Sequence, residues 1–371
     1  LMEPIFLTPV FHRLLYTTKK VYIFPEKIYT YCRSYEMEAE VMKLIDLHCD
    51  TLWKLMDMDK DGDLMENQCS VSIPFMKKAG TKAQFFACFT CLKDFEHAGG
   101  YEGCYRRVQD MIAYLNRQVQ TYPEQIGIAR SFQDMQENES QGKISAFLTV
   151  EEGGVLNGEM RRLYELYEKG VRLVTLLWNY ENCIGHPNSR DGSIMSRGLT
   201  PFGIDVVRRM DELGMIVDVS HASDGTFFDI LKYSRKPVVA SHSNCRTLCN
   251  HPRNLTDEMI RSLAETGGVA GLNFYGAFLG TGKREDADAA YEDSRIDGMT
   301  AHILHMIRVG GSDFPAIGTD FDGFDGGKTL EIPDASRMER LWDALERAGV
   351  SQGQLDKLWG DNAKRVIREV L

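Results

Sequence analysis

The 371-residue sequence predicts an α/β protein whose single large domain is a (β/α)8 TIM barrel. Apolar runs of strand length alternate along the chain with segments of helical period. Eight such runs are almost continuously apolar, as expected of parallel strands that are buried on both faces. No glycine-rich phosphate loop follows the first run, which disfavours a dinucleotide-binding sheet. Eight repeats therefore favour a closed barrel.

The predicted elements follow one another in regular order from residue 43. The strands are expected at residues 44–50, 83–90, 144–151, 171–178, 215–221, 236–242, 267–275 and 314–322. The clearest helical periods lie at residues 105–122, 159–169, 202–213, 257–265 and 296–309. This alternation of strand and helix predicts a parallel sheet whose outer face is covered by helices.

The first predicted strand is unusual because polar side chains interrupt it. Strict alternation would put Asp46, His48 and Asp50 on one face. A His and an Asp separated by one residue can hold the same cation. Alternatively, Asp50 caps the following helix and His48 is a histidine of the core.

Polar residues that can bind a metal ion or titrate also end other predicted strands. They are His48 and Asp50, Glu151 and Glu152, His221, His242, and Asp320 and Asp322. Each has an ordinary interpretation alone, as a cap, a turn or a solvated side chain. In a barrel, however, all strand ends meet at the C-terminal rim, where barrel enzymes carry their chemistry. Their convergence predicts a metal site, and so a barrel of the metal-dependent hydrolase type.

The ligand types indicate which metal and which reaction to expect. Histidine and carboxylate donors suit Zn²⁺, with Mn²⁺, Co²⁺ or Fe²⁺ as alternatives. Two ions would use every ligand: one with His48 and Asp50, the other with His221 and His242, bridged by a Glu. Such a pair of ions activates water, so hydrolysis is the predicted reaction class.

Two further roles are expected at this rim. Asp320 is the candidate proton shuttle, with Asp322 as a competitor that Gly323 places at the start of a loop. The loop after His242 carries Arg246 and Arg253, and either guanidinium can bind a substrate carboxylate.

The composition limits which binding partners and which cellular compartment are expected. The net charge of -11 disfavours a nucleic-acid partner. No run reaches the roughly 18 apolar residues needed to span a bilayer, so no membrane partner is expected. The nine scattered cysteines favour a reducing, cytoplasmic location. We interpret Cys88 and Cys91 as core of a strand rather than as a redox or zinc site.

Residues 1–42 differ from the rest of the chain. They are rich in aromatic and basic residues without a clear period, begin with Leu1, and place Met37 and Met42 shortly before the first strand. We expect an N-terminal extension, either outside the native fold or packed on the barrel as an arm. Residues 43–371 are expected to form one catalytic barrel domain.

From about residue 43 to the end, the sequence resembles the membrane (renal) dipeptidase family of zinc peptidases. The segments that carry the resemblance are His48-Cys-Asp50, Val150-Glu-Glu-Gly-Gly, residues 210–221 ending in Val-Ser-His221, Ala240-Ser-His242-Ser, Arg253-Asn254, Asn273-Phe-Tyr275, Gly318-Thr-Asp320-Phe-Asp-Gly323 and Gly360-Asp-Asn-Ala-Lys-Arg-Val366. Their order along the chain makes the resemblance specific.

The resemblance implies a (β/α)8 barrel with two Zn²⁺ ions that hydrolyses dipeptides, often with a D-residue at the C-terminal position. The implied metal ligands are His48, Asp50, Glu151, His221 and His242, with Glu151 as the bridge. The implied catalytic and substrate-binding residues are Asp320 for proton transfer, Arg253 for the dipeptide carboxylate, and Asn254, Tyr275 and Trp178 around the substrate.

The sequence departs from the family pattern at two places. Mammalian members have a substrate-contacting His after the fourth strand, where this chain has Trp178 and Asn179. The tandem Glu151-Glu152 also leaves a choice of bridging carboxylate, which an ungapped register assigns to Glu151. The alternatives to a dipeptidase are another binuclear metal-dependent amidohydrolase, or an inactive barrel with a binding role. A homodimer is possible.

Overall fold

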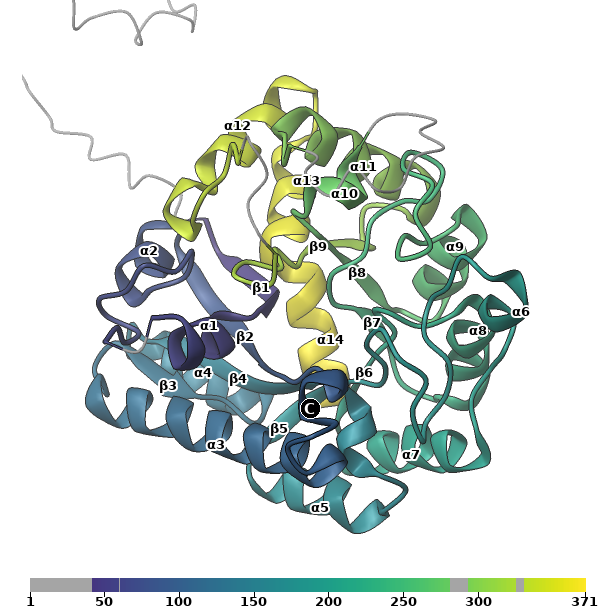
Figure 1. Cartoon of the computed structure of the whole chain (residues 1–371). Helices are drawn as coiled ribbons and strands as arrows, with labels where there is room; N and C mark the ends of the chain where they lie inside the picture. Colours follow the sequence, from purple (N-terminus) through teal and green to yellow (C-terminus); the bar gives the residue numbers. More distant parts are fainter. Residues whose placement is uncertain (1–41, 60, 281–292, 325–329) are drawn as a thin grey trace, which may run out of the picture. The chain divides into compact units, whose positions relative to one another are not determined.

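The computed structural model describes residues 42–59, 61–280, 293–324 and 330–371. Its parallel strands form a closed ring around which helices are arranged (Figure 1). The barrel strands are β1 (Leu44–Cys49), β2 (Thr81–Phe89), β4 (Ile144–Glu151), β5 (Val171–Thr175), β6 (Ile216–Asp218), β7 (Val239–Ala240), β8 (Val269–Leu272) and β9 (Pro315–Ile317). Pairing of β1 with β9 and of β2 with β4 closes the ring. The prediction of a (β/α)8 barrel is confirmed.

An additional strand, β3 (Ile126–Ile128), lies outside the ring and was not predicted. It pairs with the first residues of β4, starting at Ile144, whereas β5 pairs with the last residues of β4, from Leu148 onward. The two strands thus share one edge of β4. Three residues carry too little periodicity to mark a strand in the sequence.

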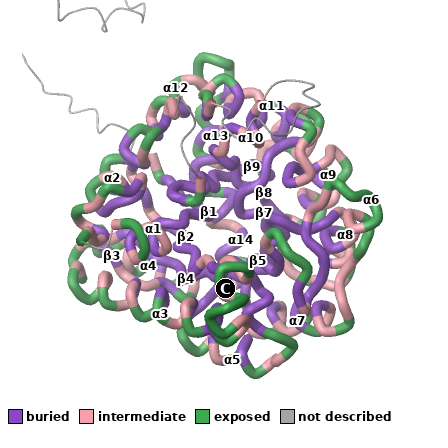
Figure 2. The backbone as a smooth tube through the Cα atoms, viewed as in Figure 1, coloured by how far each residue is buried: buried purple, intermediate pink, exposed green. Residues whose placement is uncertain are grey.

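The helices lie around the ring and at its ends (Figure 1). They are α1 (Thr51–Asp57), α2 (Ile73–Lys78), η1 (Leu92–Phe95), α3 (Gly100–Thr121), α4 (Phe132–Ser140), η2 (Gly153–Leu156), α5 (Met160–Glu168), α6 (Gly192–Met195), α7 (Pro201–Leu213), α8 (Asp224–Tyr233), α9 (Asp257–Glu265), α10 (Gly276–Leu279), α11 (Ile296–Gly310), η3 (Ala335–Arg337), α12 (Glu339–Arg347), α13 (Gln352–Asp356), η4 (Lys357–Asp361) and α14 (Asn362–Val370). Burial is concentrated in the strands, and the exposed segments lie at the periphery (Figure 2). Among the described residues, no helix is both long and apolar enough to cross a bilayer.

The last helix, α14, closes one end of the barrel and crosses its centre in Figure 1. Its apolar residues share a buried cluster with side chains of all eight ring strands, where the rings of Phe85 and Phe147 stack at 4.6 Å. Lys236 donates to the Val370 carbonyl at 2.9 Å, and Arg365 donates to the Gly267 carbonyl. Lys236 and Gly267 precede β7 and β8, so α14 seals the N-terminal end. The C-terminal end is left for a functional site.

Strict alternation along β1 is wrong. The pairing of β1 with β2 shifts register between Asp46 and Cys49, as at a β-bulge. Asp46 does not join His48 at the rim: its carboxylate accepts hydrogen bonds from the backbone N and hydroxyl of Thr319, at 2.9 and 2.8 Å. Asp46 therefore ties β1 to the end of β9.

The residues predicted as an N-terminal extension, 1–42, lie outside the described part of the chain except for Met42. The eight described cysteines are free thiols. Cys88 is fully buried in β2, as expected. Cys91 lies beyond the end of β2, so its assignment to the core of that strand is wrong.

Candidate metal centre

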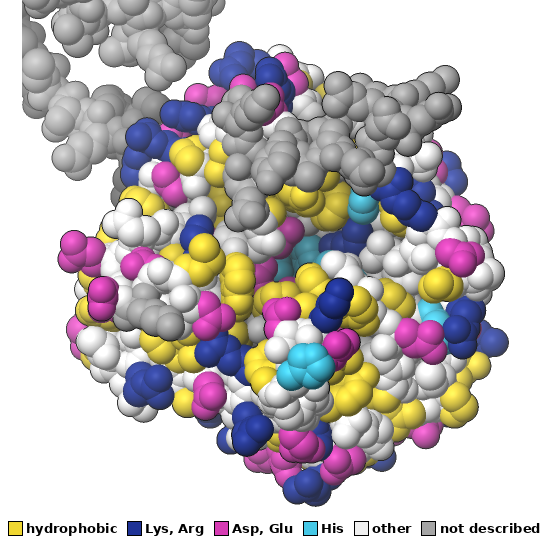
Figure 3. All heavy atoms as spheres, viewed as in Figure 1, with side chains coloured by type: hydrophobic (Ala, Val, Ile, Leu, Met, Phe, Trp, Pro, Cys, Tyr) yellow, Lys and Arg dark blue, Asp and Glu magenta, His cyan; other side chains and the backbone are white. Residues whose placement is uncertain are grey.

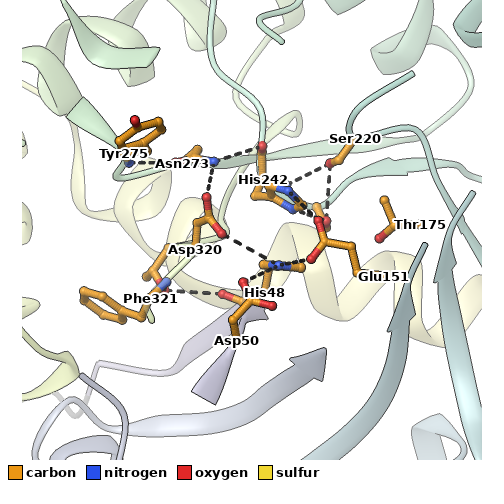
Figure 4. A network of polar contacts seen from close by, with 12 residues as sticks. His48, Asp50, Glu151, Thr175, Ser220, His242, Asn273, Tyr275, Asp320 and Phe321 are labelled. Carbon is orange, nitrogen blue, oxygen red and sulfur yellow. Dashed lines mark hydrogen bonds and ion pairs between the residues drawn. The ribbon is translucent and has the colours of Figure 1, made fainter. Parts of the chain in front are cut away.

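Six of the predicted rim residues come together at the C-terminal end of the barrel, and five of them are labelled in Figure 4. They are His48, Asp50, Glu151, His221, His242 and Asp320, and each is at most 9% exposed. His48 and Glu151 lie on β1 and β4, and the other four follow β1, β6, β7 and β9. Since these strands are spread around the ring, only its closure brings the six side chains together.

Glu151 lies at the centre of the group. Its Oε2 is 3.3 Å from His48 Nε2. Its Oε1 is 3.0 Å from His221 Nε2 and 3.6 Å from His242 Nε2. One oxygen of this carboxylate therefore faces His48, and the other faces His221 and His242.

His48 lies close to two further carboxylates. Its Nε2 lies 3.3 Å from Asp50 Oδ2 and 3.8 Å from Asp320 Oδ1. Asp50 occupies the position before α1, but its side chain makes no capping hydrogen bond. The interpretation of Asp50 as a helix cap is therefore wrong, and its carboxylate belongs to the rim cluster.

The backbone around the site is strained. Four residues other than glycine have positive φ values at the strand ends: Glu152 at 97°, His221 at 69°, Asp320 at 60° and Asp322 at 70°. Such conformations cost roughly 1–3 kcal/mol each, and they concentrate at functional sites. Of these four residues, His221 and Asp320 contribute their side chains to the cluster, whereas Glu152 and Asp322 make contacts outside it.

A chain of hydrogen bonds sets the tautomer of His242. The Ser241 hydroxyl donates to the carboxylate of Asp218, which can only accept. The same hydroxyl lies 2.8 Å from His242 Nδ1, so it accepts the proton on that nitrogen. His242 Nε2 therefore carries a free lone pair that points toward Glu151.

Asn179 sets the tautomer of His221 in the same way. The Asn179 amide oxygen lies 3.0 Å from His221 Nδ1 and accepts its proton. His221 Nε2 is then also unprotonated, and it lies 3.1 Å from His242 Nε2. Two lone pairs facing each other at this distance, beside a carboxylate oxygen, form a donor set for a cation.

The electrostatics of the buried cluster agree with this interpretation. Burial lowers the pKa of His221 to about 4 and that of His242 far below its usual range, so both imidazoles are neutral. Burial and the nearby Glu151 raise the pKa of Asp50, and burial raises that of Asp320. Against the effect of burial, Glu151 and Asp50 raise the pKa of His48 well above its usual range. Metal binding requires deprotonated ligands, so a cation bound here would displace the protons that His48, Asp50 and Asp320 hold in its absence. The donor set therefore fits a divalent cation.

The carboxylate of Asp320 is held in place by Asn273. Asn273 Nδ2 donates to Asp320 Oδ2 at 2.8 Å, and its Oδ1 accepts from the Tyr275 backbone at 2.7 Å. Asp320 Oδ1 is thereby left facing His48 (Figure 4). This arrangement suits a group that exchanges protons with a substrate.

A cavity of about 620 Å³ opens above the cluster. His, Asp and Glu side chains are visible on the floor of a hollow in the space-filling view (Figure 3). The walls are largely aromatic: Trp53, Phe89 and Trp178 line the cavity, and so do Tyr275, Phe278 and Phe324. A cavity of this size admits a small peptide.

The structure separates the two candidate arginines. Arg246 forms two hydrogen bonds with the Asp224 carboxylate, at 2.8 and 2.9 Å. Arg253 lines the cavity, where it donates to the Ser243 hydroxyl and the His242 carbonyl. Burial lowers the pKa of Arg253 to about 10, so it stays charged at neutral pH. Among the described residues, Arg253 has no carboxylate partner of its own.

Three other predicted residues lie away from the cavity. Asn254 donates to the Cys249 and Phe278 carbonyls, and so holds its own loop. Asp322 accepts from the hydroxyl of Thr51 at 2.6 Å, from Lys54 and from the Ser70 backbone. Glu152 turns away from the metal centre.

Several residues of the site had no role predicted from the sequence. They are Asn179, Asn273, Asp218 and Ser241 behind the ligands, and Trp53, Phe89, Phe278 and Phe324 in the wall. Asn273 had a usable signal, because it is a polar residue at the end of a predicted apolar strand. Asp218 had the weakest signal, since it only looked like part of the strand before His221.

Comparison with known proteins identifies the family of the chain. Residues 36–371 match the membrane dipeptidase family, peptidase family M19. The chain belongs to this family. It is accordingly a metallo-dipeptidase, a hydrolase of peptide bonds.

The chain is also similar to individual known proteins. An uncharacterized protein of Klebsiella pneumoniae is 38% identical over 60% of this chain and 80% of its own length. An uncharacterized dipeptidase of Schizosaccharomyces pombe is 32% identical over 79% of this chain and 70% of its own length. A metallopeptidase from Rhodobacter sphaeroides, solved with a phosphinate mimic of L-Ala-D-Ala, has a TM-score of 0.79 at 23% identity and covers 90% of this chain and 100% of its own.

Proposed function

We propose that this member of the family is a binuclear zinc dipeptidase that cleaves L-L and L-D dipeptides with water as the nucleophile. The observation that carries the proposal is the placement of Glu151. One of its oxygens faces His48, and the other faces His221 and His242. A carboxylate that faces two donor sets can bridge two ions.

In this proposal His48 and Asp50 would hold one ion, His221 and His242 would hold the other, and Glu151 would serve as a ligand shared by both. When bound, two Zn²⁺ ions would lower the pKa of water and polarise the carbonyl under attack. The hydrogen-bond partners behind the two later histidines support the role, because each leaves Nε2 free to coordinate.

The protein supplies the proton transfers and the binding of substrate. Asp320 accepts a proton from the attacking water and returns it to the leaving amine. Its second oxygen is occupied by Asn273, so one oxygen exchanges protons while the other fixes the orientation. Arg253 binds the carboxylate of the dipeptide, for which its charge and its place in the wall of the cavity are suited.

Trp178 and Tyr275 lie on the wall of the same cavity and would flank the dipeptide. Cleavage of L-D dipeptides is proposed because the Rhodobacter sphaeroides metallopeptidase was solved with a mimic of L-Ala-D-Ala. A cytoplasmic location stays a prediction, favoured by the free thiols of the described cysteines.

The test combines metal analysis with assays. Purified protein should contain about two transition-metal ions per chain and hydrolyse members of a panel of L-L and L-D dipeptides. A chelator should abolish turnover. Asp320→Asn should keep the metal and lower kcat by roughly 10²- to 10⁴-fold. Metal without dipeptide cleavage would indicate another amidohydrolase activity, and absence of both would indicate a binding protein.

A further inference from the structure

The second glutamate of the tandem, Glu152, is a buried acid outside the metal centre. It follows β4 directly, is 0% exposed, and has a φ of 97°. A left-handed conformation is unfavourable for a residue that carries a Cβ. Burying a carboxylate adds a further cost unless hydrogen bonds satisfy it. Two such costs at one residue call for a compensating contact.

That contact is with the loop after β5. Glu152 Oε1 accepts from Asn182 Nδ2 at 2.6 Å and from the Gly154 backbone at 2.7 Å. Asn182 Nδ2 also donates to the Leu176 carbonyl at 3.0 Å, and Asn182 Oδ1 accepts from the Ile184 backbone at 2.8 Å. One side chain thus joins the start and the end of segment 176–184 to Glu152.

The two glycines after Glu152 allow this close approach. A Cβ on Gly154 would lie 2.9 Å from Asn182 Cβ and would also collide with Glu152 Oε1. A Cβ on Gly153 would lie 2.7 Å from the Leu176 carbonyl oxygen. Real Cβ atoms do not approach other atoms so closely, so the Gly-Gly pair is required for the loop to pack on the end of β4.

The segment fixed in this way carries two residues of the site. Trp178 lines the cavity, and its ring lies 6.2 Å from that of His221. Asn179 is the residue whose amide oxygen lies 3.0 Å from His221 Nδ1. Asn179 is itself exposed, so its position depends on the backbone of the loop.

We propose that Glu152 is a positioning residue: through Asn182 it fixes the loop that presents Asn179 to His221 and Trp178 to the substrate cavity. Glu152 touches neither the cavity nor the candidate ligands beyond its chain neighbour. The tandem Glu-Glu-Gly-Gly thus combines a candidate ligand, an anchor and two residues that make room for the anchored loop. The part of this inference that concerns metal affinity rests on the proposed function.

The first experiment needs neither metal nor substrate. Hydrogen–deuterium exchange is compared on metal-free wild type, Glu152→Ala, Glu152→Gln and Asn182→Ala. Amide exchange in residues 176–185 should be at least about tenfold faster in Glu152→Ala and Asn182→Ala than in wild type. Glu152→Gln should exchange at the wild-type rate, because Gln keeps an oxygen acceptor for Asn182. Asn182→Ala tests the same link if Glu152→Ala does not fold.

Asp211→Ala is the matched control. Asp211 also accepts a backbone N–H and a serine hydroxyl, from Arg235 at 2.6 Å and Ser234 at 2.9 Å, but lies outside this loop and the cavity. It should lower Tm without changing exchange in residues 176–185. Unchanged exchange of this segment in Glu152→Ala and Asn182→Ala would overturn the proposal.

The second experiment measures affinity for Zn²⁺ and Co²⁺ by competition with a chelator. Glu152→Ala should lower the affinity for the more weakly bound ion by roughly tenfold or more, as the loss of a residue that orients a ligand does. The double variant Glu152→Ala/Asn179→Ala should bind this ion no more weakly than the single variant of lower affinity, because both changes act on His221. Additive losses would overturn the route through Asn179. Wild type that binds neither ion would refute the proposed function, and the exchange experiment would still decide the role of Glu152.

Discussion

The Nε2 atoms of His221 and His242 lie 3.1 Å apart, and each histidine has its Nδ1 engaged by a hydrogen-bond acceptor. Neither Nε2 therefore carries a proton, and the two lone pairs repel each other unless a cation lies between them and Glu151. Affinity for that cation depends on the tautomers as much as on the ligands themselves.

The tautomer of His242 can be changed without touching a ligand. In Asp218→Asn, the new amide would donate to Ser241 Oγ, which would then donate to His242 Nδ1 and move the imidazole proton to Nε2. We expect metal affinity to fall by roughly 10- to 100-fold in a chelator competition assay. Asp211→Asn, a similar change far from the rim, should leave affinity unchanged. Equal affinities in Asp218→Asn and wild type would contradict the tautomer assignment.

Arg253 is expected to recognise the carboxylate of the substrate. Arg253→Ala should raise KM for a dipeptide by roughly 10- to 100-fold, because a charge-assisted hydrogen bond is lost. Wild type should discriminate against the same dipeptide amidated at its C-terminus, and the variant should not. Arg172→Ala is the control, since Arg172 is also buried and donates to the Arg130 and Tyr167 carbonyls away from the cavity. A variant that still discriminates against the amide would exclude this role.

Gly323 leaves the space in which two rim carboxylates meet. A Cβ at this position would lie 2.5 Å from Asp320 Oδ1 and would also collide with Asp50 Oδ2. Gly323→Ala should lower kcat/KM at least about tenfold while Tm changes little, because the collision moves carboxylate oxygens of the candidate metal centre rather than the core. Gly353→Ala, where nothing lies within 4 Å of the new Cβ, should retain full activity. Comparable activity of Gly323→Ala and Gly353→Ala would show that the carboxylates of Asp50 and Asp320 can move aside without loss of activity.

The sequence predicted the barrel and the members of the rim cluster because each of these residues directly follows an apolar run. This signal is shared by His48, Glu151, His221, His242 and Asp320. Closure of the ring then brings their side chains together. Their catalytic and metal-binding roles stay predictions.

Other features had no local signal. The choice between Arg246 and Arg253 depends on Asp224, which lies 22 residues before Arg246 and claims its guanidinium. The register shift in β1 arises from pairing with β2, so alternation read from one strand misplaced Asp46. Asn179 approaches His221 only because the loop after β5 is folded onto β4. Contacts of this kind are set by tertiary packing and not by the order of residues along one segment.

The pH dependence of stability provides a test away from the metal centre. His302 lies buried in α11, and its Nδ1 accepts the Cys245 backbone N–H at 3.0 Å. Burial lowers its pKa from 6.5 to about 4. Between these values the unfolded chain binds a proton at this histidine and the folded protein does not. Stability should therefore be full above pH 6.5 and fall as the pH drops toward 4.

His302→Gln keeps an oxygen acceptor for Cys245 but removes the titration. Urea unfolding of metal-free protein between pH 4 and 6.5 should show a dependence of the unfolding free energy on pH that is smaller by about 1.4 kcal/mol per pH unit, the value for one proton. Met306→Leu, one turn further along the same helix, should change the stability but not this slope. An unchanged slope in His302→Gln would mean that His302 takes up its proton in the folded protein as readily as in the unfolded chain.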